Sequence, residues 1–143
     1  IASEKPESSY FEQTLDSAQR GNVEDQNQLA IMYFDGEDLP QNYHKAFEWS
    51  EKASKQGSSS AQLILATLYI QGKGVRQDYS LGRKWLLEAA SQGNAGAQGY
   101  LGEIYEYGTG VRQDKIKAKE WYGKSCDNGL QVGCDLYRKL NQK

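Results

Sequence analysis

The sequence predicts an all-α solenoid made of antiparallel helix pairs, and an internal repeat is the main reason for this prediction. Tryptophan recurs at a constant interval of 36 residues, from Trp49 to Trp85 and from Trp85 to Trp121. Other residues keep the same interval: Gly21, Gly57, Gly93 and Gly129; Leu29, Leu65 and Leu101; Tyr33, Tyr69 and Tyr105. Each interval also holds two apolar stripes with helical spacing, separated by glycine. A repeat of this length with two helices per unit is typical of a helical solenoid.

The second unit shows how the first helix of each repeat is defined. Ala61, Leu65 and Leu68 are spaced so that they lie on one face of a helix. Gly72 follows this stripe, and glycine readily adopts the left-handed conformation that commonly ends a helix. We therefore expect a helix over residues 59–71.

The second helix of the same unit follows a glycine-containing turn. Asp78 is suited to begin it, because an aspartate carboxylate accepts hydrogen bonds from the free N–H groups at a helix start. The helix then runs through Trp85 and ends at Gly93. Tyrosine and tryptophan side chains are expected to fill the space between units. By the same criteria, we expect helices at residues 7–20, 23–35, 43–56, 59–71, 79–92, 95–107, 115–128 and 131–140.

Single helices at the two ends are expected to cap the stack, since each repeat buries its apolar face only against its neighbours. Phe11, Leu15 and Ala18 form the apolar stripe of the first capping helix, and Leu136 and Leu140 belong to the last. The sequence therefore predicts one repeat domain over residues 1–143. Its parts are an N-terminal capping helix in 1–21, repeats at 22–57, 58–93 and 94–129, and a C-terminal capping helix in 130–143.

Composition and charge argue against several classes of function. The net charge is -2 and the pI is about 5.5, whereas nucleic-acid-binding proteins normally carry a basic stripe. No apolar run approaches the roughly 18 residues that a membrane helix needs. One histidine and two cysteines are too few for a typical zinc site made from these residues. We therefore expect no nucleic-acid partner, no membrane span, no metal and no cofactor.

The third unit resembles the Sel1-like repeat, a relative of the tetratricopeptide repeat. The similarity runs from Ala97 to Val111 and continues through Asp114 and Trp121. Residues 21–129 fit it as three units, although the first turn, Gly36–Pro40, lacks the second glycine. The resemblance implies a right-handed superhelix whose concave side, formed by the first helices, receives a protein or peptide partner.

Cys126 and Cys134 lie on either side of the bend expected at Gly129. Helices that fold back across such a bend can bring two Cβ atoms to the roughly 3.5–4.5 Å that a disulfide needs. Their context also resembles the cysteine-rich, secreted branch of the Sel1-like family, in which such a bridge pins a second helix to the next first helix. We therefore expect a disulfide and a periplasmic or secreted location. The alternative is a pair of buried free thiols in a cytoplasmic protein.

The resemblance also raises an enzyme alternative, because some cysteine-rich relatives have been associated with weak penicillin binding or β-lactamase activity. A serine β-lactamase needs a Ser-x-x-Lys motif, and this chain contains none. His44, its single histidine, is expected to face solvent on a helix. We therefore predict that the chain is not an enzyme; the alternative is a weak penicillin-binding or β-lactamase-like cell-wall enzyme.

Positions that differ between repeats on the inner faces of the first helices are free to encode a partner. Apolar side chains in such a groove suit a protein interface, and Glu103 and Glu106 favour a basic partner segment. Alternatively, these apolar side chains pack against the next repeat or against a chain end. The predicted partner-binding residues are Ile31, Phe34, Leu63, Thr67, Ile70, Gln71, Glu103, Glu106 and Tyr107. The predicted function is protein–protein interaction, for which the family resemblance implies a periplasmic adaptor or an immunity protein that neutralises its partner.

Overall fold

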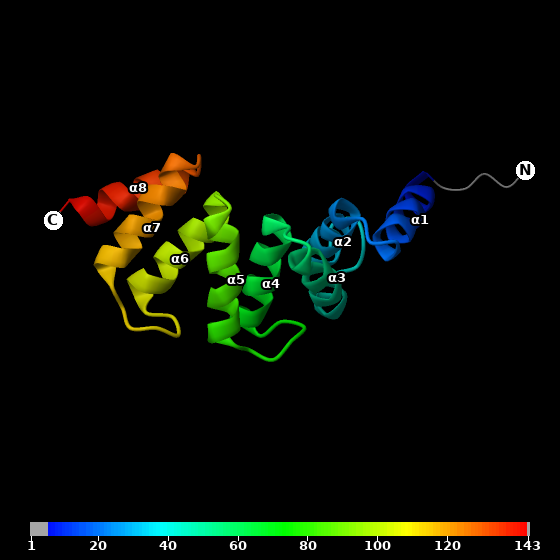
Figure 1. The fold of residues 1–143 in the computed structure, drawn as a ribbon, viewed down its shortest axis with the longest axis horizontal. Helices are drawn as coiled ribbons and strands as arrows, with labels where there is room; N and C mark the ends of the chain where they lie inside the picture. The colour runs from blue at the N-terminus through cyan, green and yellow to red at the C-terminus, as the bar shows by residue number, and fades with distance from the viewer. Residues whose placement is uncertain (1–5, 143) are drawn as a thin grey trace, which may run out of the picture.

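The computed structural model of the chain describes residues 6–142, and within them it has eight α-helices and no strand. Consecutive helices pack against one another, and the pairs follow along a curved array with α1 and α8 at opposite extremes (Figure 1). The predicted all-α solenoid of helix pairs is confirmed. Residues 1–5 and 143 of the predicted domain lie outside the described residues. The helices are α1 (Pro6–Gln19), α2 (Val23–Asp35), α3 (Tyr43–Lys55), α4 (Ser59–Gln71), α5 (Tyr79–Ser91), α6 (Ala95–Tyr107), α7 (Lys115–Asp127) and α8 (Gln131–Asn141).

The second helices end slightly earlier than the sequence pattern indicates. α3 and α5 each end one residue before the predicted boundary, at Lys55 and Ser91. Gln56 and Gln92, which follow, have φ of -89° and donate their N–H groups to carbonyls only two and three residues back. The last turn is therefore tighter than an α-helical turn, as is common at helix ends.

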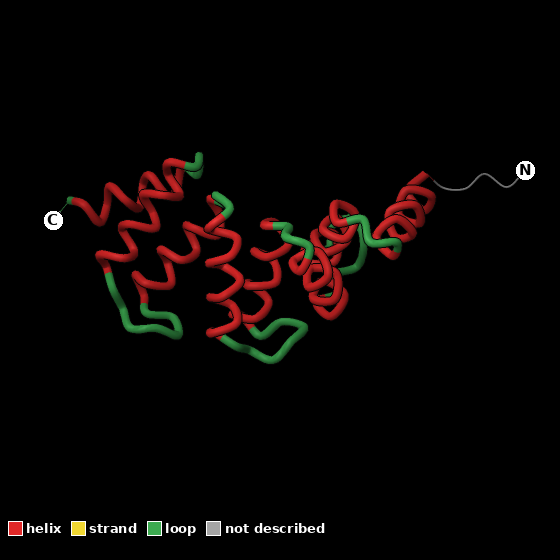
Figure 2. The backbone as a smooth tube through the Cα atoms, viewed as in Figure 1, coloured by secondary structure: helices red, strands yellow, loops and turns green. Residues whose placement is uncertain are grey.

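Helices begin and end at the capping residues that the sequence indicates. Gly72 has φ of 66° and donates its N–H to the carbonyl of Leu68, which ends α4. Asp78 accepts a hydrogen bond from the N–H of Leu81 at 3.0 Å, which begins α5. The long loops after α4 and α6 lie along one edge of the array, and the short turns after α5 and α7 lie along the opposite edge (Figure 2).

The core lies between the paired helices in two clusters of buried side chains. Leu29 and Trp49 belong to the N-terminal cluster, and Leu101 belongs to the C-terminal cluster. Trp49 is buried, but Trp85 and Trp121 are only half-buried. The tryptophans that were expected to fill the space between units are therefore buried to different degrees, Trp49 more fully than the other two.

A buried glutamine in each first helix ties that helix to the second helix before it. The side-chain amides of these glutamines donate to a backbone carbonyl eight residues earlier at 3.0–3.2 Å: Gln26 to Ala18, Gln62 to Ser54, and Gln98 to Ala90. Their side-chain oxygens accept hydrogen bonds from Gln56, Gln92 and Asn128. A buried amide without partners would cost about 1–3 kcal/mol, so this network explains why glutamine recurs with the repeat.

The disulfide replaces this glutamine bond where α8 joins the array. Cys134 occupies the repeat position of the glutamines, and Cys126 occupies the position of the residues that supply the carbonyls. The two cysteines are bonded, with a Cα–Cα distance of 4.5 Å, so the predicted bridge is confirmed. α8 is therefore fixed covalently at the point where the other first helices are held by a hydrogen bond.

Candidate binding groove

A groove of about 610 Å³ runs along the inner face of the array. Its sides come from the first helices α2, α4 and α6 and, toward the C-terminal end, from α7, α8 and the turn between them. First helices that stack side by side present one continuous surface, which is how solenoids form extended binding faces. The lining residues are Ile31, Phe34, Asp35, Ser60, Leu63, Ile64, Thr67, Gly96, Gly99, Tyr100, Glu103, Tyr122, Leu130, Val132, Gly133 and Leu136.

The charged residues in this lining are both acidic. Asp35 is on α2 and Glu103 is on α6, and both side chains are exposed. No lysine or arginine lines the groove. The groove therefore presents an apolar surface with negative charge from two different repeats.

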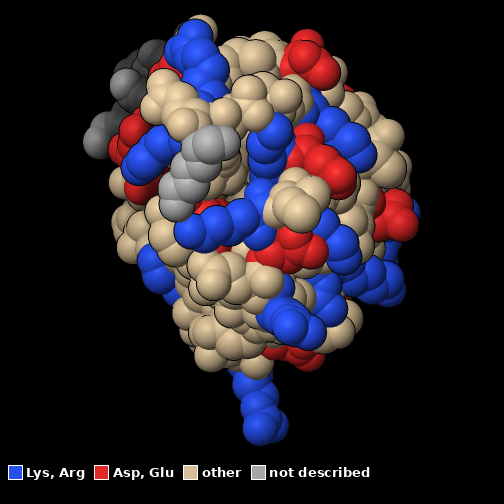
Figure 3. Space-filling view, turned by 90° about the vertical axis from the view of Figure 1, so that its left-hand side faces the viewer, with Lys and Arg blue, Asp and Glu red and all other residues tan. Residues whose placement is uncertain are grey.

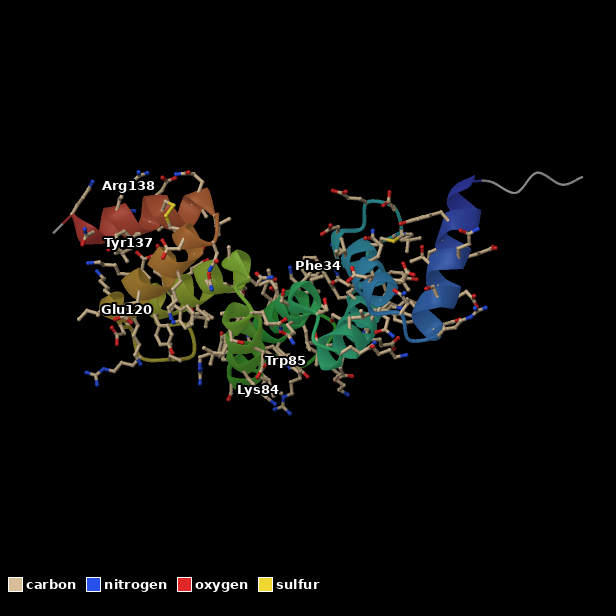
Figure 4. All side chains as sticks on the ribbon, turned by 45° about the horizontal axis from the view of Figure 1, so that its top comes forward. Phe34, Lys84, Trp85, Glu120, Tyr137 and Arg138 are labelled. Carbon is tan, nitrogen blue, oxygen red and sulfur yellow. A yellow bond between two sulfur atoms is a disulfide. The ribbon has the colours of Figure 1, made fainter. Side chains whose placement is uncertain are left out.

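Five of the nine predicted partner-binding residues lie in this groove: Ile31, Phe34, Leu63, Thr67 and Glu103. Phe34 is on α2 (Figure 4). Its ring makes an edge-to-face contact with the ring of Tyr43 on α3, with the ring centroids 5.9 Å apart. This contact restricts Phe34, and a side chain that is already ordered loses less entropy when a ligand binds.

The other four predicted residues lie outside the groove lining. Ile70 is 6% exposed and packs in the core against Gly82 of α5, so its assignment to the groove is corrected. Glu106 is half-buried beneath the surface, and Gln71 is exposed at the end of α4. Tyr107 is 67% exposed. Ile70 and Glu106 share one repeat position, and Gln71 and Tyr107 share another. The residues of the second helices beside them differ between repeats.

Glu106, which does not line the groove, is bound by Tyr122, which does. The Tyr122 hydroxyl donates a hydrogen bond to Oε1 of Glu106 at 2.6 Å. Burial raises the pKa of Tyr122, and the hydrogen bond to Glu106 and its charge raise this pKa further. Burial also raises the pKa of Tyr100, which lines the groove. Both phenols therefore stay neutral at physiological pH.

The raised tyrosine pKa values predict a loss of stability at alkaline pH. Tyr122 holds its proton more tightly in the folded chain than in the unfolded chain, whose tyrosines have pKa values of about 10. Above that pH the folded state binds more protons, so the free energy of unfolding falls as pH rises. We expect Tyr122→Phe to reduce this fall, which urea unfolding at a series of alkaline pH values measures. An identical pH slope in the variant would contradict the assignment.

The C-terminal wall of the groove was not predicted from the sequence. Leu130, Val132 and Leu136 line it, yet residues 130–143 were expected only to cap the stack. One signal was present in the sequence: Leu130 stands where the other units have Asn22, Ser58 and Asn94. Those three residues cap their helices through side-chain oxygens, whereas Leu130 makes no such bond.

The remaining sequence expectations concern isolated groups. His44 is exposed on α3 and does not line the groove. Within residues 6–142, no group of three or more His, Cys, Asp or Glu side chains is arranged to hold a metal ion. None of the described helices is long and apolar enough to cross a membrane.

Comparison with protein families gives a match to the Sel1 repeat. The matched ranges are residues 23–58, 59–94 and 95–130, each beginning one residue later than the units defined above. Together they cover 3 × 36, or 108, of the 143 residues. The comparison with curated proteins gives no match.

Several solved structures are similar in fold. The protein c5321, a protective antigen present in uropathogenic Escherichia coli strains displaying an SLR fold, has a TM-score of 0.78 and is 35% identical over 85% of this chain and 26% of its own. A Sel1 repeat protein from Oxalobacter formigenes has a TM-score of 0.76 and 25% identity over 89% of this chain and 58% of its own. Helicobacter pylori cysteine rich protein B has a TM-score of 0.71 over 88% of this chain and 96% of its own, at 19% identity. The chain thus spans less than two thirds of the first two proteins.

Proposed function

The chain belongs to the Sel1 repeat family, and we propose that its groove binds a segment of a partner protein that combines apolar side chains with lysine or arginine. Sel1-repeat proteins are in general protein–protein interaction modules. One observation carries the proposal for this chain: the groove is lined mainly by apolar side chains, and its charged residues are Asp35 and Glu103. Complementary charge across an interface favours the matching partner over others.

Leu130 supports a role for the groove beyond stability. Replacing a polar N-cap by an apolar residue costs about 1 kcal/mol of helix stability. The chain accepts that cost at the start of α8, where Leu130 makes no capping bond, and places an apolar side chain in the groove lining instead. The start of α8 is therefore less stable than it would be with a polar cap, but the groove gains apolar surface where a partner would bind.

We further propose that the protein works in the periplasm or outside the cell, as an adaptor or as a protein that neutralises its partner. The Cys126–Cys134 disulfide supports this location, because disulfides persist in oxidising compartments. Alkylating free thiols in intact cells before lysis tests this location, because bonded cysteines do not react. Alkylation of both cysteines in the native protein would contradict it.

Peptides selected from a random library on the wild-type protein are the probes that test the groove. We expect peptides selected on the wild-type protein to contain apolar residues together with lysine or arginine. Leu63→Asp places a charge in the groove and should weaken their binding by about 30-fold, or roughly 2 kcal/mol, as for the loss of one interface anchor. Leu87→Asp is the matched control, because Leu87 is 42% exposed on α5 and does not line the groove.

Charge reversal tests the second half of the proposal. Glu103→Lys should weaken binding of the selected peptides, whereas Glu88→Lys, an equal charge change at an exposed residue of α5 outside the groove, should not. Equal losses in the groove and control variants would refute the groove assignment. No observation favours the penicillin-binding or β-lactamase-like alternative; sustained nitrocefin turnover that is abolished by replacing one serine would establish it instead.

A further inference from the structure

A second concave surface lies on the long-loop side of the array, where the second and third repeats meet. It is a hollow of about 570 Å³ lined by Arg83 of α5, Tyr105 of α6, Lys117 of α7 and the loop residues Val111, Arg112, Gln113 and Asp114. We call it the basic hollow. It shares no lining residue with the groove. Figure 3, seen from the C-terminal end, shows a basic side chain projecting from the lower edge, where the long loops lie in Figure 1.

A close contact between a loop and a helix brings cations from neighbouring repeats into this hollow. Gly110 has φ of 69°, and it lies so near Tyr79 that an added Cβ would meet the Tyr79 Cβ at 2.5 Å. This contact holds the 108–114 loop against the start of α5. Arg83 stands one helical turn beyond Tyr79, so it meets Arg112 of the loop at the same hollow.

The corresponding place between the first and second repeats keeps an arginine, Arg76, at the position of Arg112 but has apolar residues in place of the other two cations. The residue at the repeat position of Arg83 is Phe47, and the residue at the position of Lys117 is Leu81. There, Phe47 packs edge-on against Tyr69, the counterpart of Tyr105, with ring centroids 5.5 Å apart. Apolar side chains can therefore occupy these two positions in the fold, and Arg83 and Lys117 occupy them between the second and third repeats.

The cations of the basic hollow outnumber its carboxylates. Among the described side chains, Arg83, Arg112 and Lys117 form no ion pair. Lys117 lies over the ring of Tyr105, 5.3 Å from its centroid. Asp114 is the single carboxylate in the lining, and it caps α7 by accepting the N–H of Lys117. Three cations against one carboxylate make this hollow positive on a chain whose net charge is -2.

We propose that the basic hollow is a second interaction surface, which binds an acidic segment of a partner protein. The planar guanidinium groups of Arg83 and Arg112 suit carboxylates, which arginine can bind through two parallel hydrogen bonds. Tyr105 supplies an aromatic wall beside them. The hollow and the groove share no lining residue, so a partner segment can bind here while the groove is occupied. This surface goes beyond the proposed groove and does not depend on it.

Binding of a fluorescent peptide of alternating Glu and Gly residues tests this surface, with the Gln-for-Glu peptide as the probe control. The decisive variant is Arg83→Phe with Lys117→Leu, which installs the side chains found at the corresponding place between the first and second repeats. It should fold as well as the wild type and bind the acidic peptide about tenfold more weakly, as expected for losing charge-assisted hydrogen bonds. Lys55→Gln with Lys139→Gln removes the same net charge elsewhere and should leave affinity nearly unchanged.

Several outcomes would overturn the proposal. Equal weakening in both double variants would mean that only overall charge matters. Vesicles containing phosphatidylserine that bind through Arg83 and Lys117, when the peptide does not, would indicate a membrane surface. Complete displacement of the peptide by millimolar inorganic phosphate would indicate a phosphate site. Leu63→Asp should leave acidic-peptide binding intact; a loss there would place the peptide in the groove, whereas failure of the groove experiment alone would leave this surface standing.

Discussion

Replacing Gly74 by alanine should lower the free energy of unfolding by about 2–5 kcal/mol, the sum of left-handed strain and overpacking. Gly74 has φ of 71°, which alanine adopts only with strain. An added Cβ would also meet backbone atoms of the preceding repeat: the carbonyl of Tyr43, whose carbon would be 2.5 Å away, and the amide nitrogen of His44 at 2.9 Å. Backbone cannot rotate aside as a flexible side chain can, so the contact between repeats must open.

Gly57→Ala is the matched control for this prediction. Gly57 has φ of 95°, and an added Cβ would meet nothing within 4 Å. It should therefore cost only the conformational strain of about 1–2 kcal/mol. Urea unfolding followed by circular dichroism measures both variants. Equal losses at Gly57 and Gly74 would show that the loop does not pack against the preceding repeat, which would contradict this stacking of the repeats.

Removing the disulfide by Cys126→Ser with Cys134→Ser should lower the free energy of unfolding by about 2–3 kcal/mol, from the chain-entropy estimate for a small loop. The loss should be concentrated in α8, because the start of that helix lacks a side-chain cap. Hydrogen exchange measured by mass spectrometry should therefore show faster exchange in α8 than in α4. Because Leu130 and Leu136 line the groove, peptide binding should weaken as well.

A second variant separates the covalent bond from the position that it occupies. Cys126→Ala with Cys134→Gln places in this slot the residues that the preceding unit has at Ala90 and Gln98, whose side-chain-to-carbonyl bond is 3.0 Å long. It should recover about 1 kcal/mol relative to the serine variant, the usual net value of one hydrogen bond. A variant no more stable than the serine pair would show that the disulfide and the glutamine bond are not equivalent.

The fold could be predicted from the sequence because its determinants are local and repeated. Gly72 and Asp78 decide where α4 ends and where α5 begins, and both do so through backbone geometry within a few residues. The periodic glutamines were visible, but their role was not, since each bonds to a carbonyl of one other helix and to the residue that follows the end of a second helix. Bonds of that kind depend on how helices pack, which a repeat pattern does not specify.

The groove was predicted less well because equivalent sequence positions have different neighbours. Phe34, Ile70 and Glu106 share one repeat position. Ile70 is buried because α5 has Gly82 opposite it, and the space of the missing side chain is filled by the isoleucine. The counterpart of Gly82 in α3 is Ala46, whose methyl group takes up part of that space, and Phe34 lines the groove instead.

The central claim is that a partner segment binds along the inner face of the first helices. Amide chemical-shift changes in the labelled protein, recorded on titration with a peptide selected from the random library, test it most directly. The proposal predicts the largest changes in α2, α4, α6 and the start of α8, near residues such as Phe34, Leu63 and Leu136. Changes confined to the second helices α3, α5 and α7, with the first helices unaffected, would contradict it.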